Sequence, residues 1–131
     1  YLRDYFEPLD RLGLVDLVDG NVQVSPHVST VVTIGHTTSH QCVVVEPEDS
    51  PPIVFLGDLA PAPIHLERYA WIPGVDILPI HSLDSKRSMA RWVADTDAIC
   101  VFQHETDEPV GTLQEDGRHF RFTPIEGPGL P

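Results

Sequence analysis

The sequence predicts an α/β protein in which helices flank a mixed β-sheet. Two segments, 1–13 and 82–94, repeat apolar residues with the period of a helix. Three short runs rich in β-branched residues, 28–34, 41–46 and 53–58, are nearly continuous in apolar character, which is typical of strands covered on both faces. A fourth strand is predicted at 98–102. With 131 residues in all, strands and helices that alternate in this way predict one small domain at most.

The N-terminal part predicts a helix followed by a hairpin. The apolar residues of YLRDYFEPLDRLG share one helical face, and Gly13 is a plausible stop. They are Leu2, Tyr5, Phe6, Leu9 and Leu12. The next segment, VDLVDGNVQV (15–24), predicts a hairpin that turns at Asp-Gly-Asn. Because the chain opens inside a predicted helix and without methionine, we expect it to be a fragment of a longer protein.

The C-terminal part predicts a long loop, a helix and a second hairpin. Residues 59–78 are rich in proline, and long ordered loops of this kind often carry function. Ser82 is expected to cap a helix that runs to about Ala94. Its inward stripe comprises Leu83, Met89, Trp92 and Val93, while Asp84, Lys86, Arg87 and Arg91 face water. A hairpin over 110–122 follows, and residues 125–131 are expected to fray.

Composition excludes several classes of partner. Twenty acidic residues against eight basic ones give a net charge of -12, so a nucleic-acid backbone would be repelled. No apolar run approaches the roughly 20 residues that a membrane span needs, and no basic, apolar leader opens the chain. Cys42 and Cys100 lie in apolar strands, where cysteine usually behaves as a buried hydrophobe rather than a disulfide partner. We therefore expect a cytoplasmic protein that contacts neither nucleic acid nor membrane.

Three side chains that are able to bind metal follow predicted strands directly. His36 follows VVTIG, Asp58 follows IVFLG, and His104 follows ICVFQ. The ends of strands in layered α/β sheets open onto the ligand crevice, so these side chains could converge there. Imidazole with carboxylate suits zinc, iron or manganese better than magnesium or calcium. Taken singly, each residue has a plainer interpretation, as a hydrogen-bonded loop histidine or a Gly-Asp turn.

The stretches GHTTSHQCVVVE, IVFLGDLAP and AICVFQHE resemble, in this order, the second half of a metallo-β-lactamase-fold hydrolase. VDLVDG, HLERYAW and LDSKR resemble its lactonase-like branch, and the resemblance covers nearly the whole chain. It implies half of a four-layer αββα sandwich over residues 1–131. Thr38 and Ser39 depart from the usual turn of this family, and Glu105 stands where aspartate is common.

The same resemblance implies roles for individual residues. His36 would bind a first metal ion, Asp58 would bridge two ions and act in catalysis by orienting the water, and His104 would bind the second ion. His40 would be a hydrogen-bonding neighbour of the site. The stretch 61–71 would form part of the substrate wall, with three candidate contacts, His65, Tyr69 and Trp71. For His65 an ordinary loop histidine is an equal alternative.

The family motif His-x-His-x-Asp-His, which supplies the remaining ligands, occurs nowhere in the sequence. Three ligands shared by two zinc ions, or by iron or manganese, fall short of the three or four that a catalytic ion needs. We therefore expect the N-terminal half of the domain to come from another chain or fragment, and this chain alone to be inactive. A solitary half would also expose an apolar sheet face.

Several functions stay open at this point. The first is metal-dependent hydrolysis of a small molecule, a lactone or ester before a thioester or β-lactam. A second is a scaffold half-domain that has lost the dinuclear site and only docks onto a partner. A third is a mononuclear iron oxygenase acting on sulfur compounds. The chain could also form a homo-oligomer.

Overall fold

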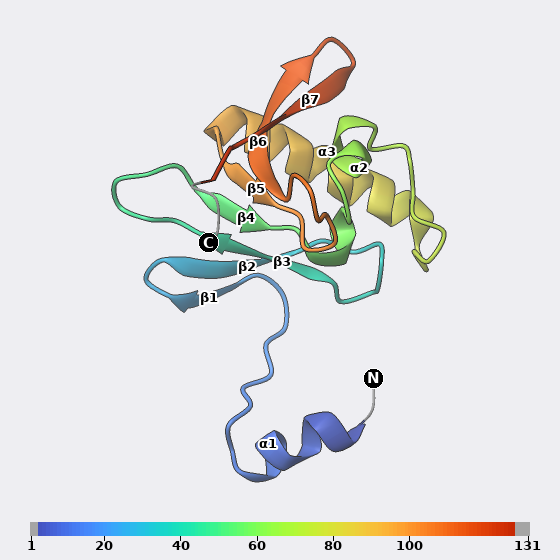
Figure 1. Ribbon diagram of the computed structural model, residues 1–131. Coiled ribbons are helices and arrows are strands. Elements are labelled where there is room, and N and C mark those ends of the chain that lie inside the picture. Colours follow the sequence, from blue (N-terminus) through green and yellow to red (C-terminus); the bar gives the residue numbers. More distant parts are fainter. Residues whose placement is uncertain (1–2, 128–131) are drawn as a thin grey trace.

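The computed structural model describes residues 3–127 and contains a seven-stranded mixed sheet whose strands lie in chain order, β1 to β7 (Figure 1). The strands are β1 Val22–Ser25, β2 Val28–Val32, β3 Gln41–Val45, β4 Ile53–Phe55, β5 Ile99–Val101, β6 Val110–Asp116 and β7 His119–Pro124. The helices are η1 Arg3–Tyr5, α1 Glu7–Arg11, η2 Gly57–Leu59, α2 Ile64–Glu67 and α3 Pro79–Thr96. A strand forms within each of the four predicted strand segments, and the C-terminal hairpin is confirmed.

One strand pair decides where the helices lie. β4 and β5 are parallel, whereas all other neighbouring strands are antiparallel. A parallel pair needs a crossover connection, and here the chain makes it through α2 and α3. The packing of α3 on β6, and of α2 on β7 and α3, covers one face of the sheet (Figure 1).

The core lies between α3 and that covered face. Paired residues Val44, Val54 and Cys100 form one row across β3, β4 and β5, and all are buried. Met89 and Val93 of α3 belong to the same buried cluster. Both cysteines are free and buried, and burial raises the pKa of each thiol to about 12.

The opposite face of the sheet is apolar and only partly covered, so the prediction that both faces of these strands are buried is wrong for the chain by itself. We call it the open sheet face, made of Val43, Val45, Ile53, Phe55, Ile99 and Val101. Each of these residues is paired with another of the set across β3, β4 and β5, and none is buried. Phe55 is 37% exposed. An apolar sheet face of this kind is the surface that a second sheet covers in a sandwich.

The N-terminal segment differs from its prediction. The predicted helix 1–13 is reduced to η1 and α1, with Gly13 in a left-handed conformation at its end (φ +66). Tyr1 and Leu2 lie outside the described residues. The predicted hairpin 15–24 is wrong, because only β1 forms, and it pairs with β2. Side chains compete for the backbone here: Asn21 accepts the N–H of Val32, and Gln41 donates to the carbonyl of Gly20.

Helix α3 also begins earlier than predicted. Pro79 occupies the first turn, where its missing N–H costs nothing, so Ser82 is not the cap. The predicted inward residues Met89 and Val93 are buried, but Lys86, which was predicted to face water, is fully buried. Its Nζ donates to the Trp71 carbonyl at 2.6 Å, which satisfies the ammonium group inside the fold.

The ends of the described chain add two findings. The first residue of the predicted frayed tail is held to the sheet, because the N–H of Ile125 bonds to the Val110 carbonyl at 2.9 Å. Residues 128–131 of that tail lie outside the described part. Within 3–127, no helix is both long enough and apolar enough to cross a membrane.

Candidate metal centre

His36, Asp58 and His104 meet at one edge of the sheet. His104 Nε2 lies 2.8 Å from Asp58 Oδ1, and His36 Nε2 lies 3.6 Å from Asp58 Oδ2. They follow β2, β4 and β5, which run in the same direction because β3 is antiparallel to both β2 and β4. The ends of the three strands therefore open onto the same crevice. Each oxygen of one carboxylate thus faces a different imidazole.

The turn that carries Asp58 is shaped by Gly57 and held by two side chains. Gly57 has φ +54, and a Cβ added there would lie 2.9 Å from His40 Nε2. The N–H of Gly57 donates to Gln103 Oε1 at 2.7 Å, and the N–H of Asp58 donates to His40 Nε2 at 3.1 Å. Gln103 directly precedes His104, so one bond ties two of the three site loops together. Sequence reasoning missed Gln103, although its place beside a candidate ligand was a usable signal.

His40 lies beside His36, with the two ring centroids 6.1 Å apart, and it contacts the Asp58 turn. Since its Nε2 accepts a hydrogen bond from an N–H, its proton must reside on Nδ1, which contacts Thr33 Oγ1 at 2.7 Å. Burial is the main cause that lowers the pKa of His40, which favours the neutral imidazole that this acceptor role requires. His40 therefore acts on Asp58 through the backbone.

A buried carboxylate lies against His36. Asp76 Oδ1 accepts a hydrogen bond from His36 Nδ1 at 3.1 Å, and Asp76 Oδ2 accepts one from Ser82 Oγ at 2.5 Å. The side chain of Asp76 is 0% exposed. Carboxylates commonly fix the ring of a metal-binding histidine in this way. Sequence spacing could not point to Asp76, because it lies 40 residues from His36 within an irregular loop.

His104 is the least constrained of the three. Its side chain is 59% exposed, and within residues 3–127 its one side-chain hydrogen bond is to Asp58. The neighbouring Glu105 does not reach the centre, because its Oε1 accepts the N–H groups of Thr106 and Asp107 at 2.9 and 3.1 Å. The acidic residue after His104 therefore shapes its own turn.

The three predicted substrate contacts lie in different surroundings. His65 Nδ1 accepts the N–H of Ala62 at 3.2 Å, and burial is the main cause that lowers its pKa. Tyr69 packs edge to face on Phe120 of β7, with the two ring centroids 6.4 Å apart, and the guanidinium of Arg87 lies above the Tyr69 ring. Trp71 is 62% exposed. Their substrate roles stay predictions.

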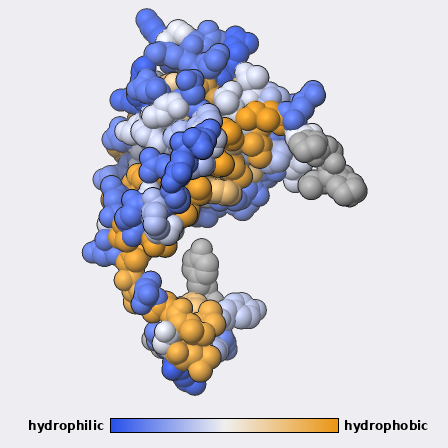
Figure 2. Space-filling model, turned by 90° about the vertical axis from the view of Figure 1, so that its left-hand side faces the viewer, coloured by the Kyte–Doolittle hydropathy of each residue, from blue (hydrophilic) through white to orange (hydrophobic). Residues whose placement is uncertain are grey.

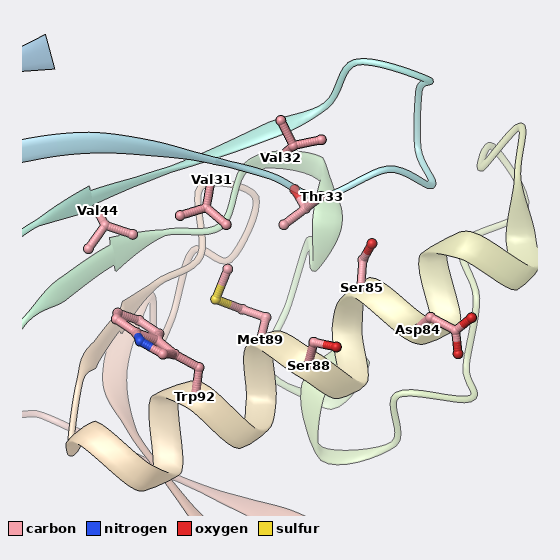
Figure 3. Close-up of a pocket in the computed structure, with 9 residues that line it drawn as sticks. All are labelled: Val31, Val32, Thr33, Val44, Asp84, Ser85, Ser88, Met89 and Trp92. Atoms are coloured by element: carbon pink, nitrogen blue, oxygen red, sulfur yellow. The ribbon is translucent and has the colours of Figure 1, made fainter. Parts of the chain in front are cut away.

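A separate apolar pocket of about 390 Å³ lies on the helix-covered side of the sheet (Figure 3). There Met89 and Trp92 of α3 face Val31 and Val44 of β2 and β3 (Figure 3). None of His36, Asp58 and His104 lines it. Despite its size, this pocket lacks the imidazole and carboxylate groups on which the chemistry depends, so the strand-end centre is the better candidate site.

The donor set fits one side of a dinuclear centre. Two imidazole nitrogens flank one carboxylate, which is a mixed set suited to zinc, iron or manganese. Two ions placed along this row would each meet one imidazole and one carboxylate oxygen, fewer than the three or four protein ligands of a catalytic zinc. Residues 3–127 contain no group of three or more His, Cys, Asp or Glu side chains able to hold an ion.

Comparison with solved structures assigns the fold. The hydrolase AbOPH of the β-lactamase superfamily matches with a TM-score of 0.80 and 18% identity, over 97% of this chain and 44% of that chain. AidC, a dizinc quorum-quenching lactonase, matches with a TM-score of 0.78 and 16% identity, over 98% and 48%. A probable metal-dependent hydrolase from Staphylococcus aureus matches with a TM-score of 0.75 and 19% identity, over 90% of this chain and 42% of that chain.

The fold is therefore that of the metallo-β-lactamase hydrolases, which confirms the fold recognised from the sequence motifs. More particularly, the chain corresponds to one half of that fold, since it spans less than half the length of each of these three proteins. No family model matches the sequence. No curated protein matches it either.

Proposed function

We propose that this chain supplies one half of the active centre of a metal-dependent hydrolase. The observation that carries the proposal is the row His36, Asp58, His104, in which one carboxylate lies between two imidazole Nε2 atoms at 3.6 and 2.8 Å. A carboxylate that presents its two oxygens to opposite sides is suited to bridge a pair of cations. The fold match to hydrolases, one of them a dizinc lactonase, supports two zinc ions, with iron or manganese as alternatives.

Bound metal ions would supply a water of lowered pKa and polarise a substrate carbonyl. The residues of this chain would hold these ions and orient the groups that bind them. His36 and His104 each direct Nε2 at Asp58, and Asp58 joins their two positions. His40 and Gln103 fix the Asp58 turn through its backbone N–H groups, so the carboxylate does not need to reorganise when it binds.

The partner in this proposal is a second half-domain that contributes the remaining ligands. Its docking surface is the open sheet face, whose apolar row is continuous over β3, β4 and β5. The N-terminal segment adds more exposed apolar side chains, which Figure 2 shows apart from the sheet. A chain that spans less than half of its fold relatives, with such a surface, supports an occupant that carries the other sheet. A second copy of the chain is the alternative occupant.

The substrate class is a small lactone or ester. The fold relatives include lactonases, one of them crystallised with an N-hexanoyl homoserine product, and this chemistry needs only a hydroxide and a polarised carbonyl. Residues of the stretch 61–71 lie after Asp58 and would form part of the wall. The cytoplasmic location expected from the sequence stays part of the proposal.

A scaffold half-domain is the second candidate. It is favoured by the incomplete donor set, because no side-chain group among residues 3–127 is able to hold an ion by itself. In that case the open sheet face would bind its partner without metal, and the His36, Asp58, His104 row would be a retained hydrogen-bonding network.

The two candidates separate in one experiment. The coding sequence around this chain is searched for His-x-His-x-Asp-His, and the segment found is produced together with the chain. Metal content and lactone hydrolysis are then measured for wild type, Asp58→Ala and Asp49→Ala, an exposed carboxylate in the turn after β3 that serves as control. The hydrolase predicts two bound ions, with metal and activity lost only in Asp58→Ala. Assembly without metal, equal in all three proteins, supports the scaffold.

A further inference from the structure

Asp76 is a buried carboxylate whose two oxygens are both engaged. Its side chain is 0% exposed, with Oδ1 on His36 Nδ1 at 3.1 Å and Oδ2 on Ser82 Oγ at 2.5 Å. Ser82 is likewise fully buried. A buried carboxylate is costly unless it is paired and hydrogen-bonded, so this arrangement strongly favours one position of the group.

The loop that presents Asp76 is pinned at both ends. On one side, Lys86 Nζ holds the Trp71 carbonyl at 2.6 Å, and Lys86 lies one helical turn beyond Ser82. On the other side, the N–H of Leu78 donates to the Gly35 carbonyl at 2.9 Å. The loop before His36 is thereby tied to the loop after Asp76.

Gly35 makes this approach of the two loops possible. A Cβ added to it would lie 2.4 Å from Ser82 Cα, a distance that a real side chain does not adopt. The backbone before His36 therefore rests directly on the first turn of α3. A second hydroxyl from the same helix, Ser85 Oγ, donates to the Ile34 carbonyl at 2.7 Å and adds to this contact.

We propose that Asp76, held by Ser82, is the positioning residue of His36. It keeps the proton of the imidazole on Nδ1 and turns Nε2, with its free lone pair, toward Asp58. The side-chain hydrogen bonds of Asp76 within the described residues are to His36 and Ser82, so it acts on the centre through His36. The consequence for metal binding rests on the function proposed above, whereas the orientation of the ring does not.

The test uses this chain produced together with the segment that carries His-x-His-x-Asp-His, as wild type and in three variants. Asp76→Asn removes the carboxylate charge at nearly constant shape, and Ser82→Ala removes the hydroxyl that holds it. Ser85→Ala is the matched control, because it deletes a hydroxyl of the same helix bonded to the same loop without touching Asp76. Two measurements are made on each protein: the His36 tautomer in the metal-free state, from its imidazole ¹⁵N shifts, and the affinity for Co²⁺.

Wild type is expected to show a single Nδ1–H tautomer at His36. Asp76→Asn mixes the tautomers and weakens Co²⁺ binding by about 10- to 100-fold, the usual effect of losing such a partner. Ser82→Ala changes the His36 tautomer and the Co²⁺ affinity in the same direction as Asp76→Asn but by less, and Ser85→Ala changes neither. Should Asp76→Asn fail to fold by circular dichroism, Ser82→Ala decides.

An unchanged tautomer and Co²⁺ affinity in the folded Asp76 and Ser82 variants would overturn the positioning role. A wild type that binds no Co²⁺ while its His36 tautomer responds to both variants would instead overturn the proposed hydrolase and leave the positioning role standing. Equal effects in Ser85→Ala would show that the helix contact in general, rather than Asp76, sets the ring.

Discussion

The loops of the candidate centre and the N-terminal segment, residues 3–21, differ in how far this chain organises them. In the centre, the two successive N–H groups of Gly57 and Asp58 are bound by side chains of other loops. In the N-terminal segment, Leu12 is 71% exposed and Leu17 is 91% exposed. The segment stands apart from the sheet (Figure 1). The turn that carries Asp58 is held by hydrogen bonds within this chain, whereas the apolar side chains of the N-terminal segment lack apolar contacts.

This difference bears on what the proposed partner would contribute. Hydrogen bonds between loops hold the His36, Asp58, His104 row without help from another chain. Apolar side chains gain stability only when they leave water, and those of the N-terminal segment have not done so. In the proposal above, the second half-domain would supply burial and additional ligands, whereas the hydrogen bonds of this half of the centre lie within this chain.

The largest expected effect tests the contrast between core and N-terminal segment. Leu113 in β6 is 1% exposed, so Leu113→Ala should lower the free energy of unfolding by about 2 to 5 kcal/mol. Leu17→Ala, the matched change in the exposed segment, should alter it by less than about 0.5 kcal/mol in this chain. Urea denaturation followed by circular dichroism measures both. Similar losses in the two variants would contradict the exposed placement of the N-terminal segment.

The sequence predicted the strands well because local composition determines them. Runs such as QCVVV have few other stable solutions, and each became a strand. The hairpin at 15–24 failed because its outcome depended on side chains distant in sequence, including Gln41, which binds the Gly20 carbonyl. The prediction for Lys86 failed for a related reason. Helical periodicity gives the face on which Lys86 lies, but the hydrogen bond from its ammonium group to the Trp71 carbonyl exists only in the tertiary fold.

The candidate centre was predictable in part. His36, Asp58 and His104 each follow a strand, and strand direction alone brings them to one edge. Their convergence is found, whereas their binding of metal stays a prediction. Asp76 and Gln103 could not be derived from spacing, because each acts through a contact made only after the loops have packed.

The next largest effect is a difference in stability between variants of two histidines of the centre. In metal-free protein, His40→Ala should lower the free energy of unfolding by about 1 to 3 kcal/mol, because the Asp58 N–H and the Thr33 hydroxyl lose their partner. His104→Ala should cost less than about 0.5 kcal/mol, since that side chain is 59% exposed. Thermal unfolding of both variants gives the comparison. A greater loss at His104 would mean that the organisation of the centre has been assigned to the wrong residue.

A smaller effect is expected at Gly57. Gly57→Ala forces a side chain into a left-handed conformation, which costs about 1 to 2 kcal/mol, and pushes its Cβ against His40. Gly117→Ala is the matched control, because Gly117 has φ +64 with nothing within 4 Å of an added Cβ. The difference between the two losses, measured by urea unfolding, isolates the His40 contact. Equal losses would show that His40 yields easily and does not hold the Asp58 turn.

The smallest effect concerns pH and the buried Lys86 that anchors the Asp76 loop. Burial lowers the pKa of Lys86 from 10.5 to about 8, so between these values the unfolded chain binds the proton that the folded chain has released. Because the unfolded state binds more protons there, the stability of wild type should rise from pH 8 toward pH 10.5. The gain between pH 7 and pH 9 should be on the order of 1 kcal/mol. Lys86→Met should lack this rise while keeping the buried volume, as urea unfolding at several pH values will show. A parallel rise in both proteins would assign it to other groups, and Lys86 would then remain charged inside the fold.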